Sequence, residues 1–178
     1  MSGVKLPSEN GDETGGINVL VLGVGNMLLA DEGTGPRVVE ELYRGYMIPD
    51  SLEVIDGGTM GMDLLPYIEG RSHLIVIDAV DTGTGKPGHT VRLDLEDPPS
   101  FFRTMVSPHQ LGLAEVLGVA AMTECMPPNI IVIGVEPASL ETSLDLSPEV
   151  EARIPELVDM VRNELDTLGY PLEPLADA

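Results

Sequence analysis

The stretch Asn18-Val19-Leu20-Val21-Leu22-Gly23-Val24 is a continuous apolar run that ends in glycine-containing sequence. Such a run is typical of a central strand of a parallel sheet, because a strand buried on both faces does not alternate between apolar and polar residues. Strand patterns recur at 52–56, 73–80 and 129–136, and helical patterns separate them. This alternation predicts an α/β domain: a three-layer sandwich with a mostly parallel, twisted, five-stranded sheet and helices on both faces.

The fifth strand is expected at 89–95. The segment before it, Gly83-Thr84-Gly85-Lys86-Pro87-Gly88, is too short to hold the crossover helix that a parallel connection needs. We therefore expect residues 89–95 to pair antiparallel with the strand at 73–80 through a hairpin, and to lie at an edge of the sheet.

Proline and glycine mark the expected helix ends. The first helix is expected near Pro36, and the last pattern runs from Ser147 to a C-terminal cap at Gly169. Pro155 should kink that last helix or mark a later start. The apolar face of the first helix is predicted to contain Val38, Val39, Leu42, Tyr43 and Tyr46.

The length of 178 residues favours one domain, which we expect over residues 17–170. Residues 1–16 are polar and contain no apolar core of a signal peptide, so we expect a disordered leader there. Residues 171–178 are expected to form a frayed tail.

The charge is strongly acidic, with 9 Lys and Arg against 30 Asp and Glu, a net charge of −21. A nucleic-acid partner is not expected, because such binding needs a basic surface. Membrane insertion is not expected either, because no apolar stretch approaches the roughly 20 residues of a membrane span. These features favour a cytoplasmic protein. Cys125 is the single cysteine, which excludes an intrachain disulfide, and we interpret it as a half-buried structural thiol.

Three residues with metal-binding side chains follow different strands. Ligands of doubly wound sheets bind outside the carboxyl ends of the strands. Glu32, Asp78 and His109 are expected on three loops at that edge, and two carboxylates with an imidazole suit a borderline divalent ion. Each residue alone has an ordinary structural explanation. His73 and His89 are weaker candidates, since one starts a strand and the other precedes the edge strand.

A dinucleotide site is not favoured by the first loop. Gly23-Val24-Gly25 begins like a G-x-G-x-x-G fingerprint, but Leu28 occupies the place of the third glycine. The acidic pair Asp31-Glu32 would also repel a pyrophosphate.

Five motifs occur in order along the chain: Gly23-Val24-Gly25-Asn26, Asp31-Glu32-Gly33-Thr34-Gly35, Asp56-Gly57-Gly58-Thr59, Ile77-Asp78-Ala79 and Ser107-Pro108-His109-Gln110-Leu111-Gly112-Leu113. They resemble the motifs of the hydrogenase maturation endopeptidases, and the likeness covers roughly residues 17–170. The last motif is most similar to the branch that serves uptake-type hydrogenases.

The resemblance implies an endopeptidase that removes the C-terminal extension of the large-subunit precursor of a nickel–iron hydrogenase after nickel insertion. It implies that Glu32, Asp78 and His109 bind metal, namely the nickel carried by the substrate. Zinc or cadmium can stand in for that nickel in crystals. Asp31, Glu32 and Asp78 are the catalytic candidates. Substrate recognition is implied for the loop Gly57, Gly58 and Thr59.

The attacking group stays open at this point. A metal can activate water, or a carboxylate of Asp31, Glu32 or Asp78 can act as general base. Ser107 and Cys125 are poor nucleophile candidates, because neither has a suitable context. Three other functions compete: a non-cleaving nickel or hydrogenase-precursor chaperone, a peptidase with an unrelated substrate, and a Rossmann-type oxidoreductase.

Overall fold

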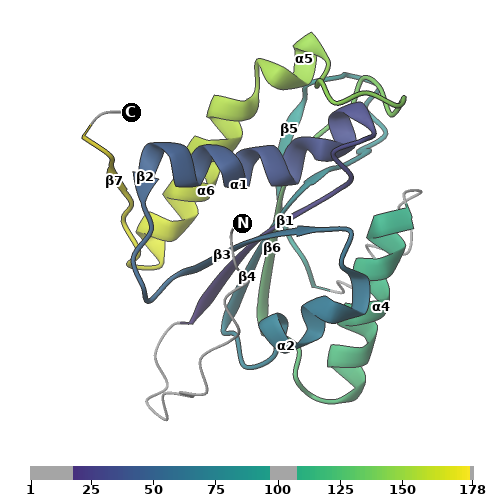
Figure 1. The fold of residues 1–178 in the computed structure, drawn as a ribbon. Helices are drawn as coiled ribbons and strands as arrows, with labels where there is room; N and C mark the ends of the chain where they lie inside the picture. Colours follow the sequence, from purple (N-terminus) through teal and green to yellow (C-terminus); the bar gives the residue numbers. More distant parts are fainter. Residues whose placement is uncertain (1–17, 97–107, 177–178) are drawn as a thin grey trace.

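A computed structural model describes residues 18–96 and 108–176 of the chain, and Figure 1 shows their arrangement. The strands of the main sheet stand in the order β3-β1-β4-β6-β5. Their bounds are β1 (Val19–Val24), β3 (Glu53–Gly58), β4 (His73–Ala79), β5 (Thr90–Asp94) and β6 (Asn129–Val135). All neighbours are parallel except β5 with β6, so the predicted mostly parallel sheet is confirmed.

Helices cover both faces of this sheet (Figure 1). One face carries α1 (Thr34–Gly45) and α6 (Ile154–Thr167), and the other carries α2 (Leu65–Ile68) and α4 (Pro108–Met122). Three short pieces complete the domain: α5 (Pro148–Glu151) and the 3₁₀ turns η1 (Ala30–Gly33) and η2 (Gly61–Leu64). Within the described residues, no helix combines the length and apolar character that crossing a bilayer requires.

The apolar run of β1 explains the three layers. Val19 and Val21 pack into the core under α1 and α6, whereas Leu20 and Leu22 pack into the core under α2 and α4. All four are fully buried. Because each such side chain contributes roughly 1.5–3 kcal/mol on burial, a central strand without polar residues stabilises both layers at once.

The edge strand β5 is antiparallel as predicted, but the predicted hairpin with β4 is wrong. β6 lies between β4 and β5, and Thr90 of β5 pairs with Val135 of β6. β4 already has parallel partners on both sides, and its residues after His73 are all buried. β5 has half-exposed and exposed residues throughout, which suits an edge and not a central position.

The C-terminal segment is ordered as far as the structure describes it, contrary to the frayed tail expected over 171–178. β7 (Glu173–Pro174) pairs antiparallel with β2 (Tyr46–Met47). Leu172 is buried in the core, and the Leu175 N–H donates to the carbonyl of Gly45 at 2.9 Å. The leader expected over 1–16 lies outside the described residues.

The ends of α1 and α6 follow the prolines and glycines with one correction. α1 starts before Pro36 and ends at Gly45, so Tyr46 belongs to β2 and not to the helix. Pro155 marks a new start, because α6 begins at Ile154 after the separate α5. Gly169, with φ of 86°, ends α6 in a Schellman arrangement, since the Tyr170 N–H reaches the carbonyl of Leu165.

Candidate functional site

The predicted site lies where the chain order reverses. β1 has β3 on one side and β4 on the other, so the carboxyl ends of β1 and β4 flank the topological switch point of the sheet. η1, which carries Glu32, follows β1 and lies against β4. Asp78 is the sixth residue of β4 itself. The two carboxylates therefore come from adjacent segments at one edge, as the sequence predicts.

Close backbone contacts press η1 onto the sheet. A Cβ atom at Gly25, where φ is 137°, would lie 1.8 Å from the carbonyl oxygen of Glu32. A Cβ at Gly35 would lie 2.3 Å from the carbonyl oxygen of Val24 and 2.4 Å from that of Ile77. Only glycine allows this approach, which places the turn with Glu32 directly at the ends of β1 and β4.

Both carboxylates are removed from solvent. Glu32 is 4 % exposed and Asp78 is fully buried. One oxygen of Asp78, Oδ1, accepts a hydrogen bond from the Ala79 N–H at 2.8 Å. A buried carboxylate is costly unless it is hydrogen-bonded, paired or bound to a metal. Two buried carboxylates at the switch point therefore need partners there, and the Ala79 N–H is one partner of Asp78.

His109 is the second residue of α4. Because α4 leads into β6, which is parallel to β4, the first turn of α4 lies at the carboxyl edge of the sheet. η2 packs beside it, since Gly61 Cα lies 3.5 Å from where a Cβ of Gly112 would be. Among the side chains that the structure describes, no group of three potential ligands forms, and the His109 side chain is outside that set.

The predicted recognition loop lies beside the first loop. The Gly25 N–H donates to the carbonyl of Gly58 at 3.0 Å, and Asp56 Oδ1 accepts from the Gly58 N–H at 3.0 Å. Gly57 is buried against Leu22 and Gly58 has φ of 42°, whereas Thr59 is exposed. The loop is thus held in place at the same edge as Glu32 and presents Thr59 to solvent.

Asp31 has a different environment from its neighbour Glu32. It is fully buried, and its carboxylate accepts four hydrogen bonds. The donors are the N–H groups of Ala138, Ser139 and Ser147 and the Ser147 hydroxyl, at 2.7–2.9 Å. The Ser139 and Ser147 contacts link parts of the chain more than 100 residues apart, which the sequence did not predict.

Glu136 is a buried carboxylate at this edge that the sequence analysis missed. It is 4 % exposed and follows β6 directly. Hydrogen bonds from the hydroxyls of Thr82 and Thr84, with one from the Lys86 N–H, lower the pKa of Glu136 to about 2. The signal was an acid directly after an apolar run, the pattern that identified Asp78. Glu136 fastens the loop between β4 and β5.

Of the other candidates, His89 is exposed at the carboxyl edge, where its carbonyl accepts from the Glu136 N–H at 2.8 Å, whereas Cys125 and His73 lie elsewhere. Cys125 is half-buried near Glu69, with Sγ 3.4 Å from Oε1, in the connection that leads into the amino end of β6. His73 is at the amino end of β4, and its Nδ1 lies 3.0 Å from the Ser72 hydroxyl. Ser107 lies outside the described residues. The interpretation of Cys125 as a half-buried thiol is confirmed.

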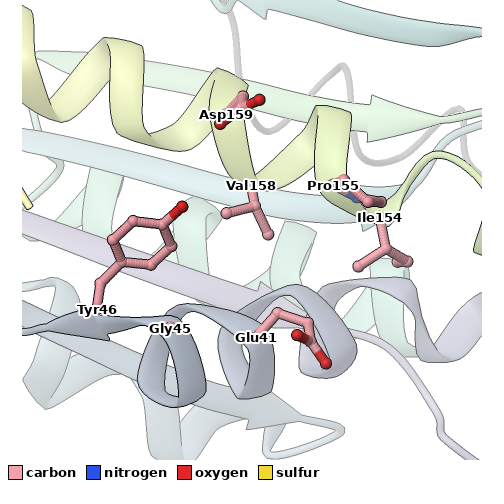
Figure 2. A pocket seen from close by; sticks show the side chains of 7 residues that line it. All are labelled: Glu41, Gly45, Tyr46, Ile154, Pro155, Val158 and Asp159. Atoms are coloured by element: carbon pink, nitrogen blue, oxygen red, sulfur yellow. The ribbon is translucent and has the colours of Figure 1, made fainter. Parts of the chain in front are cut away.

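A pocket of about 330 Å³ lies between α1 and α6 (Figure 2). It is lined by Glu41, Gly45, Tyr46, Ile154, Pro155, Val158 and Asp159. None of the predicted site residues lines it, so this pocket is separate from the switch point.

Comparisons with known proteins agree on one family. The family model HycI, described as hydrogenase maturation protease, matches residues 36–164. The chain is 43 % identical over 158 residues to the Hydrogenase 2 maturation protease of Escherichia coli K12, covering 89 % of this chain and 96 % of that protein. It is 37 % identical over 166 residues to the hydrogenase expression/formation protein HupD of Bradyrhizobium diazoefficiens, covering 90 % and 86 %.

The fold is also similar to a solved structure, the hydrogenase maturating endopeptidase HybD from Escherichia coli. The TM-score is 0.85 at 42 % identity, covering 91 % of this chain and 100 % of that one. The agreement therefore extends over nearly the whole of both chains.

Proposed function

The chain belongs to the hydrogenase maturation protease family, and from that premise we propose that it removes the C-terminal extension of a nickel–iron hydrogenase large-subunit precursor after nickel has been inserted. Membership of the family makes it an endopeptidase. The requirement for nickel, the residues that bind it and the cytoplasmic location are proposals.

One observation carries the proposal most directly: two buried carboxylates come from adjacent segments at the switch point of the sheet. Glu32 is 4 % exposed and Asp78 is fully buried, and the glycine contacts of Gly25 and Gly35 hold η1 against the strand that carries Asp78. With His109 in the first turn of α4, two carboxylate residues and one histidine come from segments at this edge. That donor set suits a borderline ion such as nickel.

In the proposed mechanism the substrate brings the nickel and the enzyme completes its coordination. Glu32, Asp78 and His109 bind the nickel of the loaded precursor. A precursor without nickel therefore offers these three residues no metal to bind. The scissile bond is then cut by a water molecule, and Asp31, Glu32 or Asp78 takes its proton if a carboxylate is the base. A general base contributes typically about 10²–10⁴-fold, so one such carboxylate matters to the rate.

A protein substrate also needs a contact surface, and exposed apolar side chains surround the switch point. Leu28 follows β1, Met60 and Met62 follow β3, and Leu140 and Leu144 follow β6. Each is 38–62 % exposed. Methionine is adaptable at binding surfaces, and exposed apolar groups around a site favour protein contact. We propose that the precursor docks on these loops, and that it does so in the cytoplasm.

The test is a cleavage assay on the large-subunit precursor, prepared with and without nickel and followed by the mobility shift that loss of the extension produces. The wild-type chain is expected to cut only the nickel-loaded form. The variants Glu32→Gln, Asp78→Asn and His109→Ala are expected to leave both forms uncut while they stay folded.

Two results would contradict the proposal. Cleavage of the nickel-free form at the same rate would remove nickel recognition, and a fully active His109→Ala variant would remove the proposed ligand set. Binding without cleavage of either form would indicate the chaperone function instead.

A further inference from the structure

The β6–α5 loop, residues 136–147, connects β6 to α5 and lies across η1. Backbone hydrogen bonds join the two segments at three points. The Ser143 N–H donates to the Leu28 carbonyl at 3.0 Å, the Ala30 N–H to the Ser143 carbonyl at 2.9 Å, and the Asp31 N–H to the Ser139 carbonyl at 3.2 Å. The loop and the turn that carries Glu32 therefore form one hydrogen-bonded unit.

The backbone of this unit is strained directly beside the site. Ala30 has φ of 44°, in the left-handed region that residues with a Cβ rarely adopt. Such strain persists only where the surroundings hold it. Here the hydrogen bond from the Ala30 N–H to Ser143, and the contacts of the next residue, Asp31, provide the restraint.

The carboxylate of Asp31 is the main link within this unit. Oδ2 accepts from the Ala138 N–H, the Ser139 N–H and the Ser147 hydroxyl, and Oδ1 accepts from the Ser147 N–H. Hydrogen bonds to a charged acceptor are stronger than neutral ones, and each donor here is a protein group and not water.

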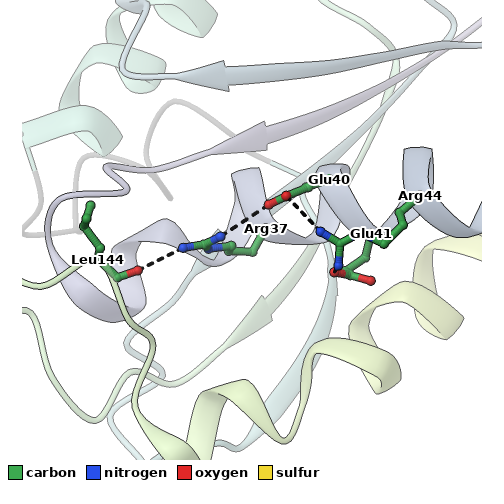
Figure 3. A network of polar contacts seen from close by, with 5 residues as sticks. All are labelled: Arg37, Glu40, Glu41, Arg44 and Leu144. Carbon is green, nitrogen blue, oxygen red and sulfur yellow. Dashed lines mark hydrogen bonds and ion pairs between the residues drawn. The ribbon is translucent and has the colours of Figure 1, made fainter.

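A second link joins the far end of the loop to α1. One terminal nitrogen of Arg37 donates to the carbonyl of Leu144 at 2.9 Å, and the other lies 3.3 Å from Glu40 (Figure 3). Arg37 is only partly buried, so this contact supports the loop from the solvent side. Asp31, in contrast to Arg37, is fully buried, and it fixes the loop directly beside Glu32.

We propose that Asp31 is a positioning residue: its carboxylate locks the β6–α5 loop onto η1 and thereby fixes Glu32 for the reaction. This inference rests on the proposed function, in which Glu32 binds the nickel of the substrate. It assigns Asp31 no proton transfer, and it narrows the possible carboxylate base to Glu32 or Asp78.

Asp31→Asn is the sharpest variant, because it keeps the shape and removes the second acceptor oxygen. The amide nitrogen, a donor, would face a backbone N–H whichever way the side chain is turned. Ser147→Ala is the milder variant, since it removes one donor to Asp31, the hydroxyl, together with the hydroxyl acceptor of the Val150 N–H at the start of α5.

Glu136→Gln is the matched control. Glu136 is also a buried carboxylate at the carboxyl edge. It is the first residue of the β6–α5 loop, but its carboxylate fastens the β4–β5 connection, where its partners are Thr82, Thr84 and Lys86. It tests whether loosening any loop at this edge reduces the rate.

The experiment measures kcat/KM for the nickel-loaded precursor against pH, at a temperature where all variants are folded. We expect at least a tenfold loss for Asp31→Asn, a smaller loss for Ser147→Ala and a change within about threefold for Glu136→Gln, with the acid limb of the profile kept in every variant. Amide hydrogen exchange of the free proteins should lose protection at 30–33 and 138–147 in Asp31→Asn, and near 82–89 in Glu136→Gln.

Each other outcome overturns the inference in its own way. Loss of the acid limb in Asp31→Asn makes Asp31 the base. A wild-type rate in Asp31→Asn removes the positioning role, and an equal loss in Glu136→Gln makes the effect one of general stability. If the wild-type chain cuts no precursor, the proposed function fails. Unchanged amide exchange at 30–33 in Asp31→Asn refutes the locking of η1, whatever the result of the cleavage assay.

Discussion

Gly25→Ala is expected to inactivate the protein by displacing Glu32, although Gly25 itself carries no functional group. The added Cβ would lie 1.8 Å from the Glu32 carbonyl oxygen, whereas ordinary contact begins at 3.4 Å. The turn that carries Glu32 therefore has to move by about 1.6 Å. A misplacement of about 1 Å can reduce an enzymatic rate by about 10²-fold, so we expect at least that loss in kcat/KM, equal to about 2.7 kcal/mol of transition-state stabilisation.

Gly70→Ala is the control for the backbone effect. Gly70 has φ of 75° and lies between α2 and β4, and nothing lies within 4 Å of the Cβ that alanine would add. Gly70→Ala should lose roughly 1–2 kcal/mol of stability from its positive φ, and only Gly25→Ala has the collision at Glu32. Urea unfolding measures the stability, and cleavage of the nickel-loaded precursor measures the rate.

The reasoning is refuted if Gly25→Ala cleaves the precursor at the wild-type rate. It is also refuted if Gly70→Ala is as slow as Gly25→Ala when both are fully folded, because the loss would then follow backbone strain and not the position of Glu32.

Three further predictions concern other parts of the chain. Because the pKa of Glu136 is lowered to about 2, its stabilising effect is complete above the ordinary value of 4.5 and disappears as the pH falls toward 2. Urea unfolding of wild type and Glu136→Gln should thus differ by a constant amount above about pH 5 and converge in acid; a difference that grows in acid would contradict this. Met60→Gln and Leu144→Gln should raise KM for the precursor several-fold with kcat unchanged, since both side chains are exposed near the site. Met122 is exposed at the far end of α4, so Met122→Gln is the control and should change neither constant. Cys125→Ala should cleave at the wild-type rate, because the thiol lies far from the switch point, and an inactive variant would reopen the question of a cysteine nucleophile.

The motifs predicted where Glu32 and Asp78 lie, because each residue follows or ends an apolar strand run. Glu32 follows β1 within one loop, and Asp78 ends the apolar run of β4, so the carboxyl-edge rule brought them to the same place. The carboxyl-edge rule could not assign a role to each carboxylate. Asp31 and Glu32 are neighbours in the sequence, yet the structure places the carboxylate of Asp31 among donors from Ala138 to Ser147.

The sequence by itself determined the five strands of the main sheet, the two-sided burial of β1 and the edge that carries Glu32 and Asp78, because apolar periodicity and glycine act over a few residues. Only the tertiary structure decided that β6 separates β4 from β5, that Leu172 packs into the core, and that the Asp31 carboxylate meets its partners 107–116 residues further along the chain. These outcomes depend on which segment pairs with a given strand edge and which groups donate to a buried carboxylate. Distant parts of the chain must pack together before either is decided.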